Sequence, residues 1–402
     1  MTTEDFSGII ELGNTNLKCI IGSIAEDLKL KIVGYSKIKS QGIHNGTIIN
    51  LKEATSAIRS CLSLAEKKAD VQLKKITVVL EQPEFLCTKL SKHRKINGSK
   101  IHKDDIAFLL KEAKKQVAAN DPRQSIIHIF NHNYIVDGKK FSKEPIDVYA
   151  DYLSHEMTFV TMSKNIIKNI NQSFVDCDIE IERFVSGTFA LAVNYFTDAE
   201  FKFGSILIDI GYEKTSLGIF KNFTLIHSIT FPIGINHVAK DISRGCSLSL
   251  EESENIRNKI GLSFAKEENL SEDFFLTSKF RKISRTLLFN IIKARVEEIL
   301  EIIKKEIDLT ELKTISGKNI FITGGGANLQ LIEQFSQNFF GTDVKILGDN
   351  NNNEITKDSS FASCLGALRI INLGWETEAI PEIANKAHKS RGFFAKIFGI
   401  AK

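Results

Sequence analysis

Two short segments far apart in the chain repeat one pattern, and this repeat constrains the fold more than any other feature. Residues 9–15 (IIELGNT) and 207–213 (LIDIGYE) each place an apolar run before an acidic residue, one further residue and a glycine. Each pattern then returns into a second apolar run, at 17–24 and 215–220. A hairpin closed by a tight glycine turn presents consecutive backbone N–H groups, which suit phosphate oxygens. Two such hairpins facing each other would hold a triphosphate from both sides.

A third segment of the same kind lies near the end of the chain. Residues 320–327 (IFITGGGA) are typical of a buried strand that runs into a triple-glycine turn, and we expect a helix to open at Asn328. Glycines let a nucleotide lie against the backbone, and a helix N-terminus favours nearby negative charge. The order of hairpin, hairpin and glycine turn indicates a nucleotide site more strongly than any one of them.

In the rest of the chain, segments with a helical pattern alternate with segments with a strand pattern. Its 402 residues are enough for two to four packed units, and 43% hydrophobic residues exclude an intrinsically disordered protein. Apolar residues at helical spacing predict helices at 51–69, 103–119, 163–174, 250–260, 280–307 and 328–339. Strands are predicted within 8–24, 75–80, 205–220 and 318–323. This is an α/β pattern.

The C-terminus holds the charge surplus of the whole chain. The formal net charge is +4, while residues 386–402 contain five basic residues and no acidic one. As a helix, residues 389–402 would gather their apolar side chains within roughly 160°, with cations at both edges. This pattern predicts an amphipathic helix that lies on an anionic bilayer through Lys389, Arg391, Phe393, Phe394, Lys396, Ile397, Phe398 and Ile400. The alternative is a helix whose phenylalanines pack on the protein's own core.

The three glycine segments resemble, in this order, the phosphate-1, phosphate-2 and adenosine motifs of the actin-like ATPase superfamily. The stretches between them, such as FPIGINH at 231–237 and EESENIR at 251–257, are similar to the FtsA family of bacterial cell-division proteins. The resemblance covers nearly the whole chain. It includes residues 85–162, which resemble the small subdomain peculiar to FtsA within the superfamily.

This resemblance implies an α/β, two-lobed actin-like (ribonuclease-H-like) fold with an FtsA-type inserted subdomain and a C-terminal amphipathic helix. The first lobe core (1A) would take 1–84 and 163–200, and the inserted subdomain (1C) 85–162. The second lobe core (2A) would take 201–227 and 306–375, and subdomain 2B 228–305. A tether at 376–388 would lead to the membrane helix at 389–402.

The resemblance also implies ATP and Mg²⁺ in a cleft between the lobes. The cofactor-binding residues would be Glu11, Gly13, Asn14, Thr15, Asn16, Asp209, Gly211, Lys214, Thr215, Gly234, Glu254, Arg257, Gly324, Gly325 and Gly326. Glu11 and Asp209 would hold the metal through water, and Glu254 and Arg257 would reach the sugar or base.

The phosphate motifs depart from the family pattern at several positions. Glu11 stands where the family has aspartate, and Ile235 replaces the second glycine of a Gly-Gly-Asn run. Asn16 replaces a usual lysine, while Tyr212 and Glu213 put bulk and negative charge where the family has glycines. No side chain stands out as a general base, so we assign no catalytic residue. We expect weak nucleotide binding and little or no turnover.

The family resemblance implies a peripheral protein on the inner face of the cytoplasmic membrane at the division site. Its partners would be the FtsZ C-terminal peptide, further copies of itself in a filament, late division proteins and anionic lipid. Nucleic acid is not expected, because the basic run at 92–95 lacks interleaved aromatics and is typical of a solvated face. The alternatives are an actin-superfamily enzyme such as a sugar kinase, or a PilM-like pilus-assembly ATP-binding protein.

Overall fold

The computed structural model describes residues 6–24, 30–263, 270, 283–309, 319–348 and 358–373. The chain divides into two compact units. The first unit comprises residues 1–202, 218–229 and 353–402, and the second comprises residues 203–217 and 230–352. Among the described helices, none is both long and apolar enough to cross a membrane.

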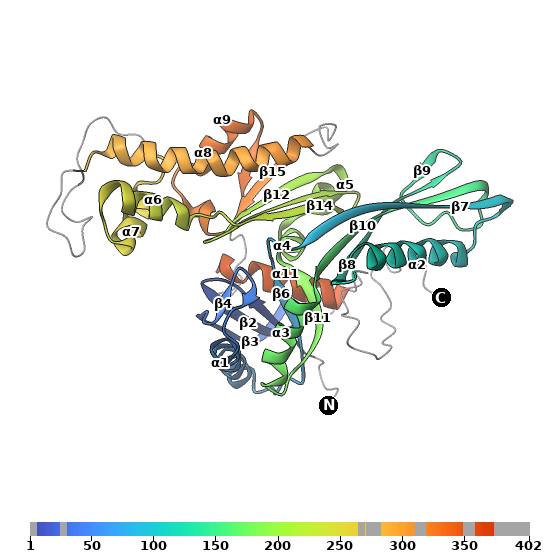
Figure 1. Ribbon diagram of the computed structural model, residues 1–402, viewed down its shortest axis with the longest axis horizontal. Coiled ribbons are helices and arrows are strands. Elements are labelled where there is room, and N and C mark those ends of the chain that lie inside the picture. The colour runs from blue at the N-terminus through green and yellow to red at the C-terminus, as the bar shows by residue number, and fades with distance from the viewer. Residues whose placement is uncertain are drawn as a thin grey trace. The chain divides into compact units, whose positions relative to one another are not determined.

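The first unit is built on a five-stranded sheet in the order β11-β6-β1-β2-β3 (Figure 1). The central strand β1 pairs antiparallel with β2 and parallel with β6. The strands are β1 (Ser7–Leu12), β2 (Asn16–Ile24), β3 (Leu30–Lys39), β6 (Lys75–Leu80) and β11 (Glu180–Ser186). The small hairpin of β4 (Ile43–His44) and β5 (Thr47–Ile48) follows β3.

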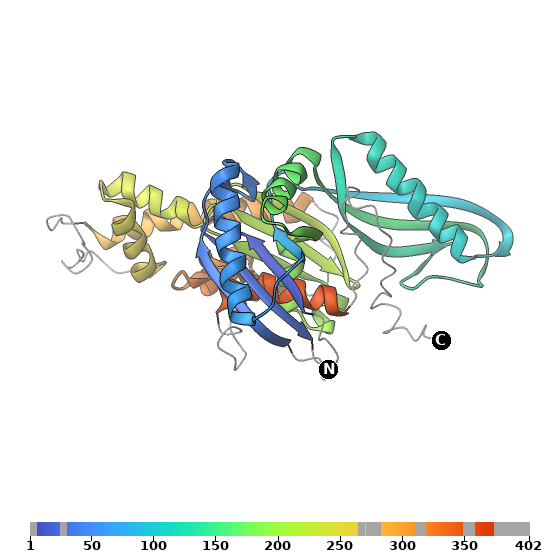
Figure 2. The same ribbon diagram turned by 90° about the horizontal axis from the view of Figure 1, so that it is seen from below.

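Four helices pack around this sheet. They are α1 (Leu51–Ala69), α3 (Lys164–Val175), α4 (Gly187–Tyr195) and α11 (Ala362–Leu373). The predicted helix at 51–69 is confirmed, and Asn50 caps it by accepting a hydrogen bond from the N–H of Glu53. α1 packs against β2 and β3 (Figure 2), whereas α11 packs against β1, β2 and α4. The helix α11, far along the chain, thereby reaches the first hairpin.

An inserted sheet in the order β7-β10-β8-β9 also belongs to the first unit. Its strands are β7 (Leu86–Lys100), β8 (Gln124–Val136), β9 (Lys139–Phe141) and β10 (Tyr149–Ser163). The helix α2 (Lys103–Asn120) covers one face of this sheet in both views (Figures 1 and 2). Two clusters of buried apolar side chains join α2 to the strands beneath it.

A third sheet has the order β14-β13-β12-β15-β16. Its strands are β12 (Ser205–Ile210), β13 (Thr215–Lys221), β14 (Thr224–Phe231), β15 (Asn319–Thr323) and β16 (Val344–Ile346). The short helix α5 (Asp198–Phe203) precedes β12. The second unit adds α6 (Asn236–Cys246), α7 (Leu250–Ile260), α8 (Arg285–Leu309) and α9 (Ile332–Phe340). α6 packs against both α7 and α8.

The predicted helix from Asn328 is wrong at its start. The glycine turn continues into a 3₁₀ turn, Gly325–Asn328, and α9 begins only at Ile332. The break has a local cause, because Leu329 returns to extended backbone and Leu331 adopts a left-handed conformation with φ 63°. The predicted tether and membrane helix, residues 376–402, lie outside the described residues.

Candidate nucleotide-binding site

The first glycine hairpin lies in the first unit, between β1 and β2. The register pairs Glu11 with Lys18 across the two strands. Gly13 is required at the turn, since a Cβ there would lie 2.5 Å from the carbonyl oxygen of Asn16. The amide of Asn14 donates to the side-chain oxygen of Asn45 (2.8 Å), which ties the tip to the β4–β5 turn. Thr15 is exposed at the end of the hairpin.

The carboxylate of Glu11 is engaged within its own unit. The Lys18 ammonium lies 2.8 Å from it, and the hydroxyl of Ser363, at the start of α11, donates a hydrogen bond to it. Lys18 also donates to the carbonyl of Ser360 (2.7 Å). Lys18, which is not among the predicted site residues, supplies an ammonium group two residues beyond the asparagine at position 16. The spacing of the hairpin could have revealed it, because an antiparallel turn places residues 11 and 18 opposite each other.

The second glycine hairpin lies between β12 and β13. The N–H of Gly211 donates to the carbonyl of Lys214 (2.8 Å), which closes a tight turn. Gly234 packs directly on this turn, since a Cβ there would lie 2.6 Å from both the Gly211 oxygen and the Lys214 nitrogen. The buried Thr215 hydroxyl donates to the carbonyl of Ile233 (2.7 Å). Residues 233–234, just before α6, therefore pack against the Gly211 turn and hold it in place.

The triple-glycine turn is placed against the same hairpin. Strand β15 runs parallel to β12, and Thr323 is the partner of Asp209. Gly324 has φ +86°, and a Cβ there would lie 2.2 Å from a carboxylate oxygen of Asp209. A Cβ on Gly326 would lie 2.3 Å from the Ile210 side chain, but one on Gly325 would meet no described atom within 4 Å. Two glycines thus allow close packing, and the third leaves bare backbone against which a nucleotide fits.

The helix α7 brings Glu254 and Arg257 to this site. Its first turn is fixed by a capping box in which Ser249 and the buried Glu252 bond reciprocally. The phenol of Tyr212 donates a hydrogen bond to Glu254 (2.5 Å). Burial, followed by this hydrogen bond to Glu254, raises the pKa of Tyr212 to about 12. The Arg257 guanidinium donates to the carbonyl of Ile235 (3.1 Å).

The negative charge of Glu213 is compensated locally. Asn236 donates to its carboxylate at 2.7 Å, and the Lys240 ammonium lies 3.2 Å away. Burial opposes ionisation, but the hydrogen bonds from Asn236 and Lys240 outweigh it and lower the pKa of Glu213 below its ordinary value. The repulsion that we expected from Glu213 toward a phosphate is therefore reduced. Lys240 is not among the predicted site residues, because it lies on α6 and only the folded chain brings α6 beside the turn.

The predicted cofactor-binding residues thus fall into two groups. The second unit brings together Asp209, Gly211, Lys214, Thr215, Gly234, Glu254, Arg257, Gly324, Gly325 and Gly326. The first unit holds Glu11, Gly13, Asn14, Thr15 and Asn16 on one hairpin. Bare glycine backbone beside a carboxylate fits a nucleotide and its metal, and their binding here stays a prediction. The eight predicted membrane-binding residues lie outside the described part of the chain.

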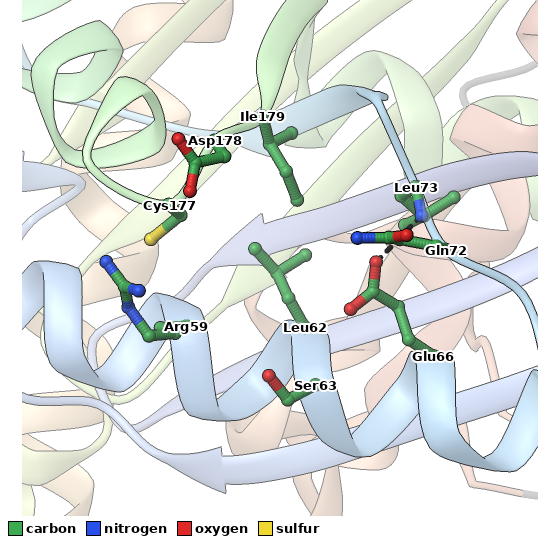
Figure 3. Close-up of a pocket in the computed structure, with 9 residues that line it drawn as sticks. All are labelled: Arg59, Leu62, Ser63, Glu66, Gln72, Leu73, Cys177, Asp178 and Ile179. Carbon is green, nitrogen blue, oxygen red and sulfur yellow. Dashed lines mark hydrogen bonds between the residues drawn. The ribbon is translucent and has the colours of Figure 1, made fainter.

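A separate pocket of about 120 Å³ opens on the first unit between α1 and the turn before β11 (Figure 3). Its polar groups largely bond to their own surroundings. Arg59 donates to the carbonyl of Asp176, and Glu66 accepts from the N–H of Leu73 at 2.7 Å. Burial raises the pKa of the Cys177 thiol. The pocket includes no predicted site residue, and we assign it no ligand.

Comparison with known proteins identifies the family. A family model described as "Cell division protein FtsA" matches residues 206–366, and one described as "SHS2 domain inserted in FTSA" matches residues 86–161. FtsA of Bacillus subtilis is 27% identical over 405 aligned residues, covering 96% of this chain and 90% of that protein. FtsA of Agrobacterium fabrum is 25% identical over 355 residues, covering 84% and 80%.

Solved structures share the fold. The PilM–PilN type IV pilus biogenesis complex superposes with a TM-score of 0.64 at 10% identity, covering 90% of this chain and 97% of that one. MreB5 of Spiroplasma citri bound to ADP gives a TM-score of 0.53 at 14% identity, covering 92% and 99%. The architecture is therefore the actin-like fold with an inserted subdomain.

Proposed function

Because this chain belongs to the FtsA family of bacterial cell-division proteins, we propose that it anchors the FtsZ ring to the cytoplasmic membrane as an actin-like, peripheral filament protein. It would bind the FtsZ C-terminal peptide, assemble with further copies of itself, and recruit later division proteins. Its position would be the inner face of the membrane at the division site. The family models over residues 86–161 and 206–366 support this assignment.

The proposal includes ATP and Mg²⁺ as ligands. The observation that carries it is the bare backbone at Gly325, in a turn whose neighbouring glycines, Gly324 and Gly326, pack against Asp209 and Ile210. Asp209 and Glu11 would hold the metal through water, and Glu254 and Arg257 would reach the sugar or base. Mg²⁺ would neutralise phosphate charge when bound. We propose weak binding and little or no hydrolysis, with nucleotide serving conformation or assembly.

The membrane part of the proposal rests on the pattern of residues 389–402. A single helix of this kind binds reversibly, whereas many tails on one filament bind strongly through avidity. The test is co-sedimentation of the full chain with anionic vesicles, compared with a chain that lacks residues 389–402 and ends at His388. We expect the full chain to sediment and the shortened chain to stay in solution. Equal sedimentation of both would contradict the anchor.

A charge-matched pair of variants separates insertion from simple attraction. Phe398→Glu places a charge on the apolar side of the predicted helix, and Gly399→Glu places the same charge on its polar side. We expect the Phe398 variant to lose vesicle binding and the Gly399 variant to retain most of it. Equal losses would indicate electrostatic attraction without insertion of the apolar side.

A further inference from the structure

Strand β7 is an edge of the inserted sheet and carries charge of one sign. In the described part of the chain it pairs with β10 and with no other strand. Its fifteen residues include five basic ones and no acidic one: Lys89, Lys92, Arg94, Lys95 and Lys100. An edge strand presents unpaired backbone N–H and C=O groups, to which another extended segment can bond.

The basic residues of β7 divide between the two faces of the sheet. On the face covered by α2, Arg94 pairs with Asp105 (3.2 Å) and lies over the ring of Phe108 (4.5 Å). Ile96 is buried in the same cluster as α2 residues. Because side chains alternate along a strand, Lys95, between Arg94 and Ile96, points to the face opposite α2.

On that open face each of two lysines lies beside a tyrosine of β10. Lys95 is the register partner of Tyr152, with its ammonium 5.9 Å from the ring centre, and Lys100 is the partner of Tyr149 at 5.6 Å. The tyrosines are 50% and 68% exposed. Neither lysine has an ion pair among the residues that the structure describes. We call these four residues the Lys–Tyr patch.

The Lys–Tyr patch changes the interpretation of the basic run. In the sequence, residues 92–95 have no aromatic neighbours, but the sheet supplies them from a strand fifty residues later. The rings hold the ammonium groups through cation–π contacts and so reduce the entropy lost when an anion binds. The patch is therefore prepared to bind acidic groups next to an open sheet edge.

We infer that β7 and the Lys–Tyr patch bind an extended acidic segment of a partner protein. The segment adds as a further strand, and its backbone bonds to the regular part of the β7 edge before Asn97 and Gly98, where the backbone turns to positive φ. Its acidic side chains on the open face lie toward Lys95, and the irregularity at these two residues brings Lys100 to the same face. An anionic bilayer or a nucleic acid would use the cations and rings, but neither would use the backbone groups of the edge. A second role for lysines on an edge strand is to prevent pairing with the sheet of another molecule. Lysines with only that role would not bind an acidic segment selectively.

The first test measures binding of a labelled peptide of about ten residues that alternates glutamate and threonine, enough to span β7 from residue 91 to 100. Full-length protein should bind it saturably. The double variant Lys95→Glu/Lys100→Glu should weaken binding by at least about tenfold, because two attractive pairs become repulsive. The matched control is Lys103→Glu/Lys111→Glu on α2, which changes net charge equally and should leave the affinity within about twofold. No binding, or equal loss in both variants, would overturn the inference.

The second test addresses the sheet edge. Two versions of the peptide are N-methylated at alternate residues, one at even and one at odd positions. An added strand offers alternate N–H groups to its neighbour, so one version should lose binding and the other should keep it. Equal affinity of both versions would overturn the proposed strand addition. A second outcome would also overturn it: the peptide does not bind, but anionic vesicles or a single-stranded oligonucleotide bind in a way that depends on Lys95 and Lys100. The wild type and the Lys95→Glu/Lys100→Glu variant have the same C-terminal tail, so a difference in vesicle binding between them reports the two lysines.

Discussion

The phenol of Tyr212 donates a hydrogen bond to the carboxylate of Glu254, and this joins the phosphate-2 turn to helix α7. Glu254 is the residue that the family resemblance assigns to the nucleotide sugar or base. In the structure, the Glu254 carboxylate already accepts a hydrogen bond from Tyr212, which belongs to the same site. A bound nucleotide must compete with Tyr212, which gives a structural reason to expect weak binding.

Removing this hydrogen bond should strengthen nucleotide binding. Tyr212→Phe keeps the ring and frees Glu254, so we expect MgATP to bind about fivefold more tightly, corresponding to roughly 1 kcal/mol for a hydrogen bond to a charged group at a partly exposed site. Calorimetric titration measures the change. Tyr152→Phe in the inserted sheet is the matched control and should bind like the wild type. An unchanged or weaker affinity in Tyr212→Phe would show that the bond does not compete with nucleotide.

Two adjacent glycines should respond differently to alanine. Gly324→Ala places a Cβ against Asp209 at a backbone of φ +86°, so we expect a loss of stability of roughly 1–3 kcal/mol in thermal or urea unfolding. Gly325→Ala meets open space and should unfold like the wild type while binding MgATP more weakly. If Gly325→Ala were as destabilising as Gly324→Ala, the description of this turn would be wrong.

The Glu11–Lys18 pair should contribute measurably to the first unit. Their side chains are 20% and 14% exposed and lie 2.8 Å apart, so solvent screens them less than a surface pair. A double-mutant cycle with Glu11→Gln and Lys18→Gln should give a coupling free energy of about 1–2 kcal/mol in urea unfolding. The exposed pair Lys115–Glu112 is the comparison and should give well under 1 kcal/mol. Equal coupling in the two cycles would contradict the structural difference.

Some parts of the candidate site can be predicted from the sequence, and others cannot. The turns at Gly13 and Gly211 and the helix at 250–260 follow from local patterns, because glycine geometry and helical periodicity act over a few residues. The Tyr212–Glu254 bond and the Glu213–Lys240 pair join different elements, so nothing local encodes them. The start of α9 differs from the predicted one because Leu331 adopts a left-handed conformation that its residue type does not favour.

The inserted sheet should weaken in acid because it holds buried, uncharged histidines. Burial, and then the charge of nearby His132, lowers the pKa of His155 to about 4, while neither ring nitrogen of His155 has a hydrogen-bond partner among the residues that the structure describes. His155 stacks on Tyr134, and Lys92 is its neighbour on β7. The pKa of His155 in the folded protein is therefore below its value of about 6.5 in the unfolded chain. The neutral ring contributes its full stability above about pH 6.5, and this contribution is lost as the pH falls from there toward about 4.

The corresponding measurement is urea unfolding between pH 7.5 and pH 5. Protonation of His155 alone should lower the free energy of unfolding by up to roughly 2 kcal/mol at pH 5 relative to pH 7.5. His155→Phe should reduce the change in the free energy of unfolding between these pH values by a comparable amount. His93→Gln, at an exposed position on β7, serves as the control and should keep the wild-type profile. A His155→Phe profile parallel to that of the wild type would contradict the prediction.

The most direct test of the nucleotide site is a titration of the full chain with MgATP, alongside Gly325→Ala and Tyr212→Phe. We predict saturable, weak binding by the wild type, weaker binding by the Gly325 variant and tighter binding by the Tyr212 variant. The order of the three affinities matters more than any single value, because it reports the glycine turn and the Glu254 carboxylate separately. No binding by any of the three, or equal affinity in all three, would contradict a nucleotide site at these residues.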